Sequence, residues 1–160
     1  MKKAILITVS VIFALILSVI AYFYIWGGKP RIENFAEVSS DYEIVAQLAL
    51  DSYGELKPYD SYPENESIII YIYDDNLKHN DSVLPLTDED KSAVLTAGKK
   101  FGYLRVYKDA VFFCRDETGY YGLVYSKHPL AALYKDGLPQ AGREYHRISS
   151  RWYEWGVWGI

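Results

Sequence analysis

The sequence predicts an α+β protein: an N-terminal transmembrane helix, then a small domain of two helices packed on a mostly antiparallel sheet of about five strands. An uncharged run of 23 residues, 4–26, lies near the start of the chain. Two segments of helical periodicity and several β-branched, aromatic segments follow it. The later strand-like segments are joined by hairpin-length connections, which favour antiparallel pairing and place both helices on one face.

Residues 4–26 are long enough to cross a membrane as a single helix. A helix of 23 residues spans about 35 Å, and the hydrocarbon core of a bilayer is roughly 30 Å thick. Aromatic residues that favour the membrane interface gather at the end of the run: Tyr22, Tyr24 and Trp26. Lys2 and Lys3 precede the run, which favours a cytoplasmic N-terminus and a C-terminal domain outside. The predicted location is the cell membrane, with a single pass.

A cleaved signal peptide is the alternative interpretation of this segment, with Val19 and Ala21 as the small residues before the cut. The apolar run continues past that position and exceeds the roughly 7–15 residues of a signal core. Both interpretations place the rest of the chain across the membrane. We therefore expect an anchor over 1–28, a short tether over 29–39 and an extracytoplasmic domain over 40–160.

Two segments of the domain carry helix signals. The first begins at Ser40, whose spacing to Glu43 fits a capping box, and Gly54 is a natural end for it. The second follows Thr87 and covers 88–99, with three acidic residues in its first turn, where the helix dipole favours negative charge.

Strand signals occupy most of the remaining domain, over 67–73, 103–107, 110–115, 120–126, 144–148 and 151–155. The first of these segments is β-branched and aromatic throughout, which is typical of a central strand. Lys108-Asp109, residues 116–119 and Ser149-Ser150 mark hairpin turns. We expect loops over 74–86 and 127–143.

Charge is unevenly distributed along the domain. Residues 29–90 contain 15 acidic and 4 basic residues, whereas 91–160 contain 6 acidic and 11 basic residues, giving balances of −11 and +5. If these parts also separate in space, one face favours a basic partner or cations and another an anionic partner. The alternative is that the helices present acidic solvent faces that the sheet balances. An acidic domain outside the membrane argues against a nucleic-acid partner.

No metal or cofactor is predicted. Residues 74–81 contain acidic and amide side chains, but Lys78 and His79 replace the oxygen ligand and the glycine that an EF-hand loop requires. Cys114 is the single cysteine, so the domain has no internal disulfide. Because it lies in an apolar strand segment, we expect a buried and unreactive thiol.

No catalytic residue is predicted either. The three histidines, His79, His128 and His146, lack the spacing of a zinc site. His128 forms a hydrolytic pair only if the fold brings it to Ser126 or Cys114, and no nucleophile motif surrounds either residue.

Aromatic residues are the most unusual feature of the composition. The chain contains 16 tyrosines and four tryptophans, three of the latter near the C-terminus. Strand alternation over 151–155 places Trp152 and Tyr153 on opposite faces, so we expect at least one large ring near the surface. Trp152, Tyr153 and Trp155 are therefore the candidate binding residues. The alternatives are that these rings close the core or rest against the membrane interface.

The function predicted from these observations is a non-enzymatic binding module of the cell envelope. It is anchored in the membrane through residues 4–26, and its partner is a protein or a cell-wall-like ligand. One alternative is a small envelope hydrolase that uses His128 or His146 with a nearby acid. Another is a subunit of a membrane assembly, in which the transmembrane helix itself makes the contact.

Overall fold

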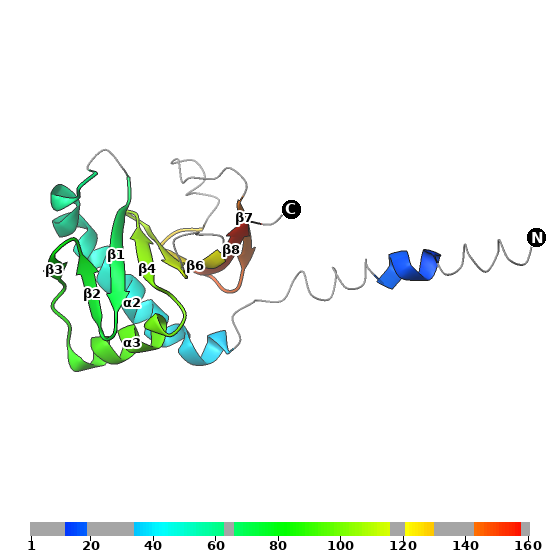
Figure 1. The fold of residues 1–160 in the computed structure, drawn as a ribbon, viewed down its shortest axis with the longest axis horizontal. Helices are drawn as coiled ribbons and strands as arrows, with labels where there is room; N and C mark the ends of the chain where they lie inside the picture. Colours follow the sequence, from blue (N-terminus) through cyan, green and yellow to red (C-terminus); the bar gives the residue numbers. More distant parts are fainter. Residues whose placement is uncertain (1–11, 19–33, 63–65, 116–120, 130–142, 158–160) are drawn as a thin grey trace, which may run out of the picture. The chain divides into compact units, whose positions relative to one another are not determined.

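Two helices cover one face of an eight-stranded antiparallel sheet in the part of the chain that the structure describes (Figure 1). The computed structural model describes residues 12–18, 34–62, 66–115, 121–129 and 143–157. The elements are α2 (Phe35–Leu56), the 3-10 helix η1 (Lys57–Tyr59), β1 (Ile68–Tyr73), β2 (Asn76–His79), β3 (Ser82–Val83), α3 (Asp88–Gly98), β4 (Tyr103–Val106), β5 (Ala110–Cys114), β6 (Tyr121–Ser126), β7 (Arg143–Arg147) and β8 (Trp152–Val157). The strand order is β3-β2-β1-β4-β5-β6-β8-β7.

The α+β class and the antiparallel sheet are confirmed, but the estimate of about five strands is wrong. The segment 74–86, predicted as a loop, contains β2 and β3. Asp74 and Asn80 take positive φ angles of 50° and 51°, which allows tight reversals between β1 and β2 and between β2 and β3. Asp and Asn tolerate this conformation better than most residues, so polar sequence here forms hairpins.

Helix α2 begins earlier and ends later than predicted. It starts at Phe35, so Ser40 and Glu43 lie inside the helix and do not cap it, and it continues through Gly54. The physical reason is tertiary packing, because the Phe35 ring lies 5.4 Å from the ring of Trp152, centroid to centroid. This contact favours helical structure upstream of the local capping signal.

Helix α3 follows the prediction closely. The Thr87 hydroxyl accepts a hydrogen bond from the Asp90 backbone N–H at 3.2 Å, and the Asp90 carboxylate accepts one from the Thr87 N–H at 2.8 Å. This reciprocal pair is a capping box. At the other end of the helix, a Cβ on Gly98 would lie 3.1 Å from Ile72 Cγ2, so the glycine allows a close approach to β1.

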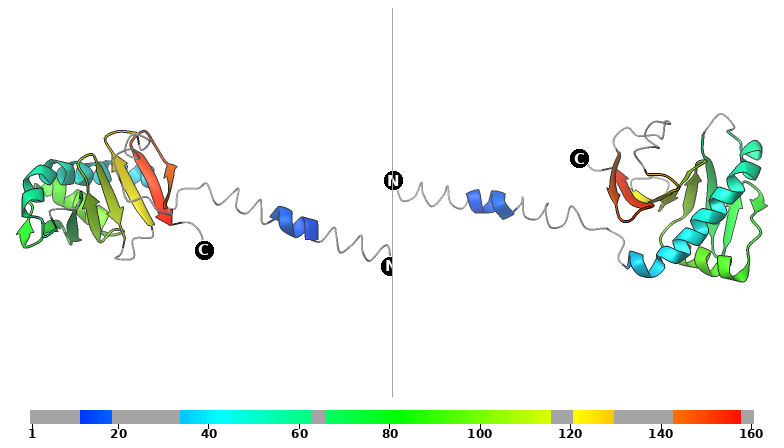
Figure 2. Two further views of the ribbon diagram at one scale, coloured as in Figure 1. Left: turned by 90° about the horizontal axis from the view of Figure 1, so that it is seen from above. Right: turned by 180° about the vertical axis from the view of Figure 1, so that it is seen from behind.

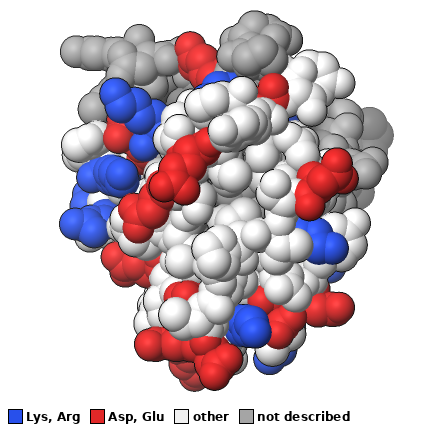
Figure 3. Space-filling view, turned by 90° about the vertical axis from the view of Figure 1, so that its left-hand side faces the viewer, with Lys and Arg blue, Asp and Glu red and all other residues white. Residues whose placement is uncertain are grey.

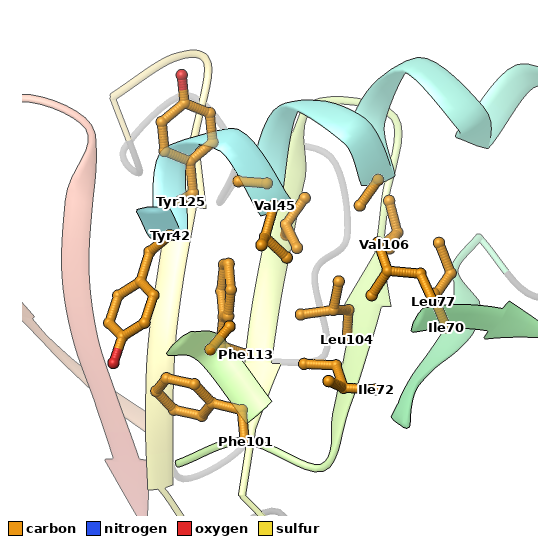
Figure 4. Packing of buried hydrophobic residues seen from close by; sticks show 14 of the residues in the cluster. Tyr42, Val45, Ile70, Ile72, Leu77, Phe101, Leu104, Val106, Phe113 and Tyr125 are labelled. Atoms are coloured by element: carbon orange, nitrogen blue, oxygen red, sulfur yellow. The ribbon is translucent and has the colours of Figure 1, made fainter. Parts of the chain in front are cut away.

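The main core lies between the helices and the sheet (Figures 2 and 4). Ile68, Ile70 and Ile72 of β1 point toward the helices and are buried. The ring of Tyr42 on α2 packs 5.6 Å from Phe101 and 5.8 Å from Phe113, centroid to centroid. Burial, reinforced by the neighbouring Asp41 carboxylate, raises the pKa of the Tyr42 phenol.

Residues at the end of the chain form the predicted hairpin of β7 and β8. The Ile148 N–H donates to the Trp152 carbonyl at 2.9 Å across the turn at Ser149-Ser150. The turn at Lys108-Asp109 is also present, because the Tyr107 N–H donates to the Ala110 carbonyl at 2.8 Å. The predicted turn at 116–119 and most of the predicted loop at 127–143 lie outside the described residues.

The N-terminal part of the chain is described only over 12–18, which is helical. Residues 1–31 and residues 32–160 form two separate units. Across the described ranges, no helix combines the length and the apolarity that crossing a membrane requires. The flanks of the predicted membrane segment, 4–11 and 19–26, lie outside those ranges, so the anchor and its orientation stay predictions.

Candidate functional site

The candidate site lies on the outer face of the sheet, defined as the face turned away from α2 and α3. Residues directly opposite each other on antiparallel strands share a face. The register therefore assigns to the outer face, from β3 to β7, Val83, Asn76, Lys78, Ile69, Tyr71, Tyr73, Tyr103, Arg105, Ala110, Phe112, Cys114, Gly122, Val124, Ser126, Tyr153, Trp155, Tyr145 and Arg147. Aromatic side chains thus run across nearly the whole sheet.

The half of this face on β4 to β8, which we call the covered half, is buried apart from three of its described side chains: Arg105 and Tyr145 are half-buried, and Arg147 is exposed. Its members form a second hydrophobic cluster, separate from the main core: Tyr103, Tyr107, Ala110, Phe112, Cys114, Val124, Tyr153 and Trp155, with Tyr145 packed against them. The Phe112 ring lies 5.8 Å from Trp155 and 6.4 Å from Tyr145, although β6 separates β5 from β8. The rings on these strands therefore pack across β6 and cover one another.

Gly122 on β6 allows this arrangement. A Cβ at this position would lie 1.9 Å from the Phe113 carbonyl oxygen and 2.8 Å from Trp155 Nε1. The Trp155 ring therefore occupies the space that a side chain on β6 would fill. Its Nε1–H donates to the Leu123 carbonyl at 3.0 Å, which satisfies the buried indole.

The half of the face on β1 to β3 is exposed. We call its side chains the tyrosine patch: Ile69, Tyr71 and Tyr73 of β1, Lys78 of β2 and Val83 of β3. Tyr71 and Tyr73 are 45% and 58% exposed, and their ring centroids are 6.5 Å apart. The Lys78 ammonium lies 5.2 Å from the centre of the Tyr73 ring. The patch is continuous with the covered half through Tyr103, whose ring lies 6.2 Å from that of Tyr71.

His79 fixes the strand that carries Lys78. Its ring is buried on the helix side, and Nδ1 lies 2.9 Å from the Ile69 carbonyl, to which it donates. In that tautomer Nε2 accepts from the Asn80 side-chain amide at 3.2 Å, and the same amide donates to the Tyr59 carbonyl at 3.0 Å. Since successive side chains on a strand alternate, anchoring His79 inward directs Lys78 outward.

The three candidate binding residues predicted from sequence are all buried. Trp152, Tyr153 and Trp155 are 4%, 7% and 1% exposed, so the expectation of a large ring near the surface is wrong. Trp152 packs on the helix side against Tyr125, with ring centroids 5.1 Å apart. Tyr153 and Trp155 belong to the covered half, because the space above Gly122 lets the outer face bury its own rings.

The exposed tyrosines of the patch were missed by sequence reasoning, although a signal for them was present. The prediction of a central strand over 67–73 does not distinguish the two faces of that strand. Its alternation places Ile70 and Ile72 on one face and Tyr71 and Tyr73 on the other. The first pair meets the helices and the second pair meets solvent.

The hydrolytic pairs considered for His128 are not formed. The Ser126 hydroxyl donates to the backbone carbonyl of His128, and the His128 side chain is exposed. Cys114 is buried, as predicted, and its thiol lies 3.7 Å from the Phe112 carbonyl. Neither nucleophile therefore directs its polar atom to an imidazole acting as a base.

One histidine does meet an acid in the register. His146 on β7 lies opposite Glu154 on β8, so their side chains share the helix-side face of the sheet. Glu154 is buried, at 2% exposed, whereas His146 is exposed. The pairing brings an imidazole and a carboxylate to neighbouring positions on one face, and such a pair is one part of a general acid–base site.

The acidic and amide residues near β2 lie in its turns and in the strand itself. Asp74 and Asp75 form the turn between β1 and β2, and Asn76 already belongs to β2. Among the residues that the structure describes, no three His, Cys, Asp or Glu side chains gather closely enough to hold a metal ion.

The acidic and basic parts of the sequence meet in space. Arg151 Nη1 lies 3.6 Å from the Glu43 carboxylate and donates to the Tyr125 hydroxyl at 3.1 Å, a hydrogen bond that raises the Arg151 pKa. Tyr125 in turn donates to Glu43 at 3.3 Å. On the side of the molecule nearest β3, uncharged side chains occupy the centre, and acidic ones gather beside it and at the lower end (Figure 3).

No protein-family model matches this chain, and neither a curated protein nor a solved structure matches it.

Proposed function

We propose that this chain is a membrane-anchored binding module of the cell envelope, which captures a partner on the tyrosine patch without acting on it as an enzyme. The observation that carries the proposal is the exposure of Tyr71 and Tyr73 on a face whose other described aromatic rings are buried or half-buried. Exposed tyrosine brings rigid, amphipathic contact area at a small cost in side-chain entropy.

Grouping is what distinguishes the patch from ordinary surface. Single exposed apolar side chains are normal on soluble domains, whereas a contiguous group marks an interaction site. Here Ile69, Tyr71 and Tyr73 alternate along one strand, and Val83 lies on the same face two strands away. Partner contact would remove this apolar surface from water, which stabilises a complex by about 25 cal/mol per Å² before the costs of association.

The sequence supports a location at the membrane. The uncharged segment 4–26 provides the proposed anchor, and the short tether that follows holds the domain near the bilayer surface. The test is membrane fractionation with an alkaline carbonate wash, followed by protease treatment of intact cells. We expect the chain to stay with the membrane and the domain to be digested; release by carbonate, or protection from protease, contradicts the anchor or its orientation.

Site-specific photocrosslinking tests the binding role directly. Two full-length variants are produced in cells that normally make the protein. One carries benzoylphenylalanine at position 73, and the other carries it at position 95. Leu95 on α3 is a matched control, because it is apolar and 48% exposed but does not lie on the outer face. We expect a discrete adduct from position 73 and none of the same size from position 95. No adduct at 73, or the same adducts at both positions, contradicts the proposal.

The rival proposal is an envelope hydrolase, and the facing of His146 and Glu154 is the observation that favours it. Its test is hydrolysis of fluorogenic ester, peptide and glycoside substrates by the full-length chain. A rate that His146→Asn abolishes, with unchanged thermal stability, would replace the binding module with an enzyme. The same rate in both proteins, or none, removes the support for this alternative.

A further inference from the structure

Resting on the proposed function, we infer that the occupant of the tyrosine patch is an acidic protein segment that also carries apolar side chains. Two cations flank the tyrosines of β1 on the same face of the sheet. Lys78 on β2 is opposite Tyr71, and Arg105 on β4 is opposite Ile69, so one cation flanks β1 on each side. The rings and the cations thus form one continuous surface.

The outer face at the tyrosine patch and on the neighbouring strand β4 is basic, although the chain is not. The outer-face positions that the register assigns to β1 to β4 include two cations, Lys78 and Arg105, and no acidic residue. The whole chain, by contrast, carries a formal net charge of −4. A partner that bears carboxylates finds opposite charge here and repulsion over acidic parts of the surface, so charge complementarity selects this face.

The shape of the patch favours a polypeptide over a polysaccharide. The rings of Tyr71 and Tyr73 are tilted by 43° to each other, and those of Tyr71 and Tyr103 by 47°. They therefore form no flat platform on which successive sugar rings would stack. Ile69 and Val83 add aliphatic surface beside them, which is suited to apolar side chains of a peptide.

The partner engages side chains and not the backbone of β1. Strand β1 is paired on both sides, with β2 and with β4, so its ladder is already occupied. A partner therefore cannot bind by pairing a strand of its own with β1. The occupant lies across the face, with apolar side chains on the tyrosines and carboxylates at Lys78 and Arg105.

Binding of defined polymers to the full-length chain in detergent micelles tests the inference. The probes are fluorescently labelled random copolymers of Glu with Tyr and of Lys with Tyr, together with poly-glutamate and hyaluronan, each followed by anisotropy. We expect the Glu–Tyr copolymer to bind most tightly, and its affinity to fall as salt rises. Equal or tighter binding of the Lys–Tyr copolymer overturns the inferred charge, and equal or tighter binding of hyaluronan overturns the choice of a polypeptide. Binding of poly-glutamate as tight as the copolymer overturns the need for apolar side chains.

Charge reversal locates the binding on the protein. Lys78→Glu should weaken binding of the Glu–Tyr copolymer by about tenfold, a change typical of a charge pair at an interface. Lys127→Glu is the matched control, because it makes the same charge change on an exposed residue after β6, three strands from β1. Equal losses in the two variants overturn the inference, since they report total charge only. Arg105→Gln checks the second cation, and thermal melting confirms that each variant is folded.

Failure of this inference is distinguishable from failure of the proposed function. A crosslinked adduct from position 73 without binding of the acidic copolymer supports a binding module whose partner has other chemistry. The absence of both contradicts the proposed function and the inference with it.

Discussion

The two halves of the outer face carry similar aromatic residues but differ in how far these residues are buried. On β5 and β8, Phe112 and Trp155 are 2% and 1% exposed, whereas on β1 Tyr71 and Tyr73 are 45% and 58% exposed. Both pairs occupy the same face of one antiparallel sheet. Residue type alone therefore does not determine burial here. The difference arises from the space and the side chains that the neighbouring strands provide.

On the covered half, Gly122 leaves room for the Trp155 ring, and the rings of β5, β7 and β8 meet across β6. On the exposed half, Lys78 and Asn76 stand opposite Tyr71 and Tyr73, so polar side chains flank the rings. The covered half is thus a second core that stabilises the fold. We propose that the exposed half serves contact with a partner.

Truncation in each half should have very different effects on stability. Trp155→Ala removes a buried ring and the Nε1 hydrogen bond, so we expect a loss of about 3–5 kcal/mol in the free energy of unfolding. Tyr73→Ala removes a ring that is mostly in solvent and should cost less than about 1 kcal/mol. Urea denaturation followed by circular dichroism measures both values. Similar losses in the two variants would contradict the division of the face.

Adding one methyl group at Gly122 should break the covered half. Gly122→Ala places a Cβ against the Phe113 carbonyl oxygen and the Trp155 ring, and we expect a loss of about 3 kcal/mol or misfolding. Gly54→Ala is the control, because it adds the same group inside α2, where nothing lies within 4 Å. That variant should gain roughly 0.5–1 kcal/mol from helix propensity. A Gly122→Ala variant that melts at or above the temperature of the parent protein would show that space at Gly122 is not the deciding factor.

The pH dependence of stability tests the burial of Tyr42, which lies on the helix side of the sheet. Burial raises the pKa of Tyr42 above its ordinary value of 10.0, so the unfolded chain loses this proton first as pH rises. The folded state then binds more protons, and stability falls above about pH 10, by at most about 1.4 kcal/mol per pH unit from this group. Tyr42→Phe lacks this ionisation, so its melting temperature relative to the parent should rise between pH 9 and pH 11, both limits being approximate. A constant difference across that range would contradict a perturbed phenol in the core.

Sequence reasoning succeeded where the deciding interactions are local. The cap at Thr87 and the acidic first turn lie within four residues, and α3 begins where those signals predict. Sequence reasoning failed where contacts between distant residues decide the length of a helix or the burial of a side chain. Phe35 extends α2 because it meets Trp152 on β8, and the burial of Trp155 depends on space at Gly122 on a neighbouring strand. No local pattern carries either contact.

The candidate site could be predicted from the sequence only in part. Alternation in β1 separates Tyr71 and Tyr73 from the buried isoleucines, and that pattern is visible in the sequence. That the matching face of β5 to β8 is covered depends on the strand order and on ring contacts across β6, which the sequence does not display. The sequence therefore favours the tryptophans as binding residues, whereas the tyrosines of β1 form the exposed surface.

The double variant Tyr71→Ser with Tyr73→Ser tests the central claim most directly. Its free energy of unfolding and its affinity for the Glu–Tyr copolymer are measured on the same full-length sample. We predict a change in unfolding free energy below about 1 kcal/mol and at least about a tenfold loss of affinity. A loss of stability comparable to that of Trp155→Ala, or retained affinity in a folded variant, would contradict the assignment of the exposed tyrosines to partner contact.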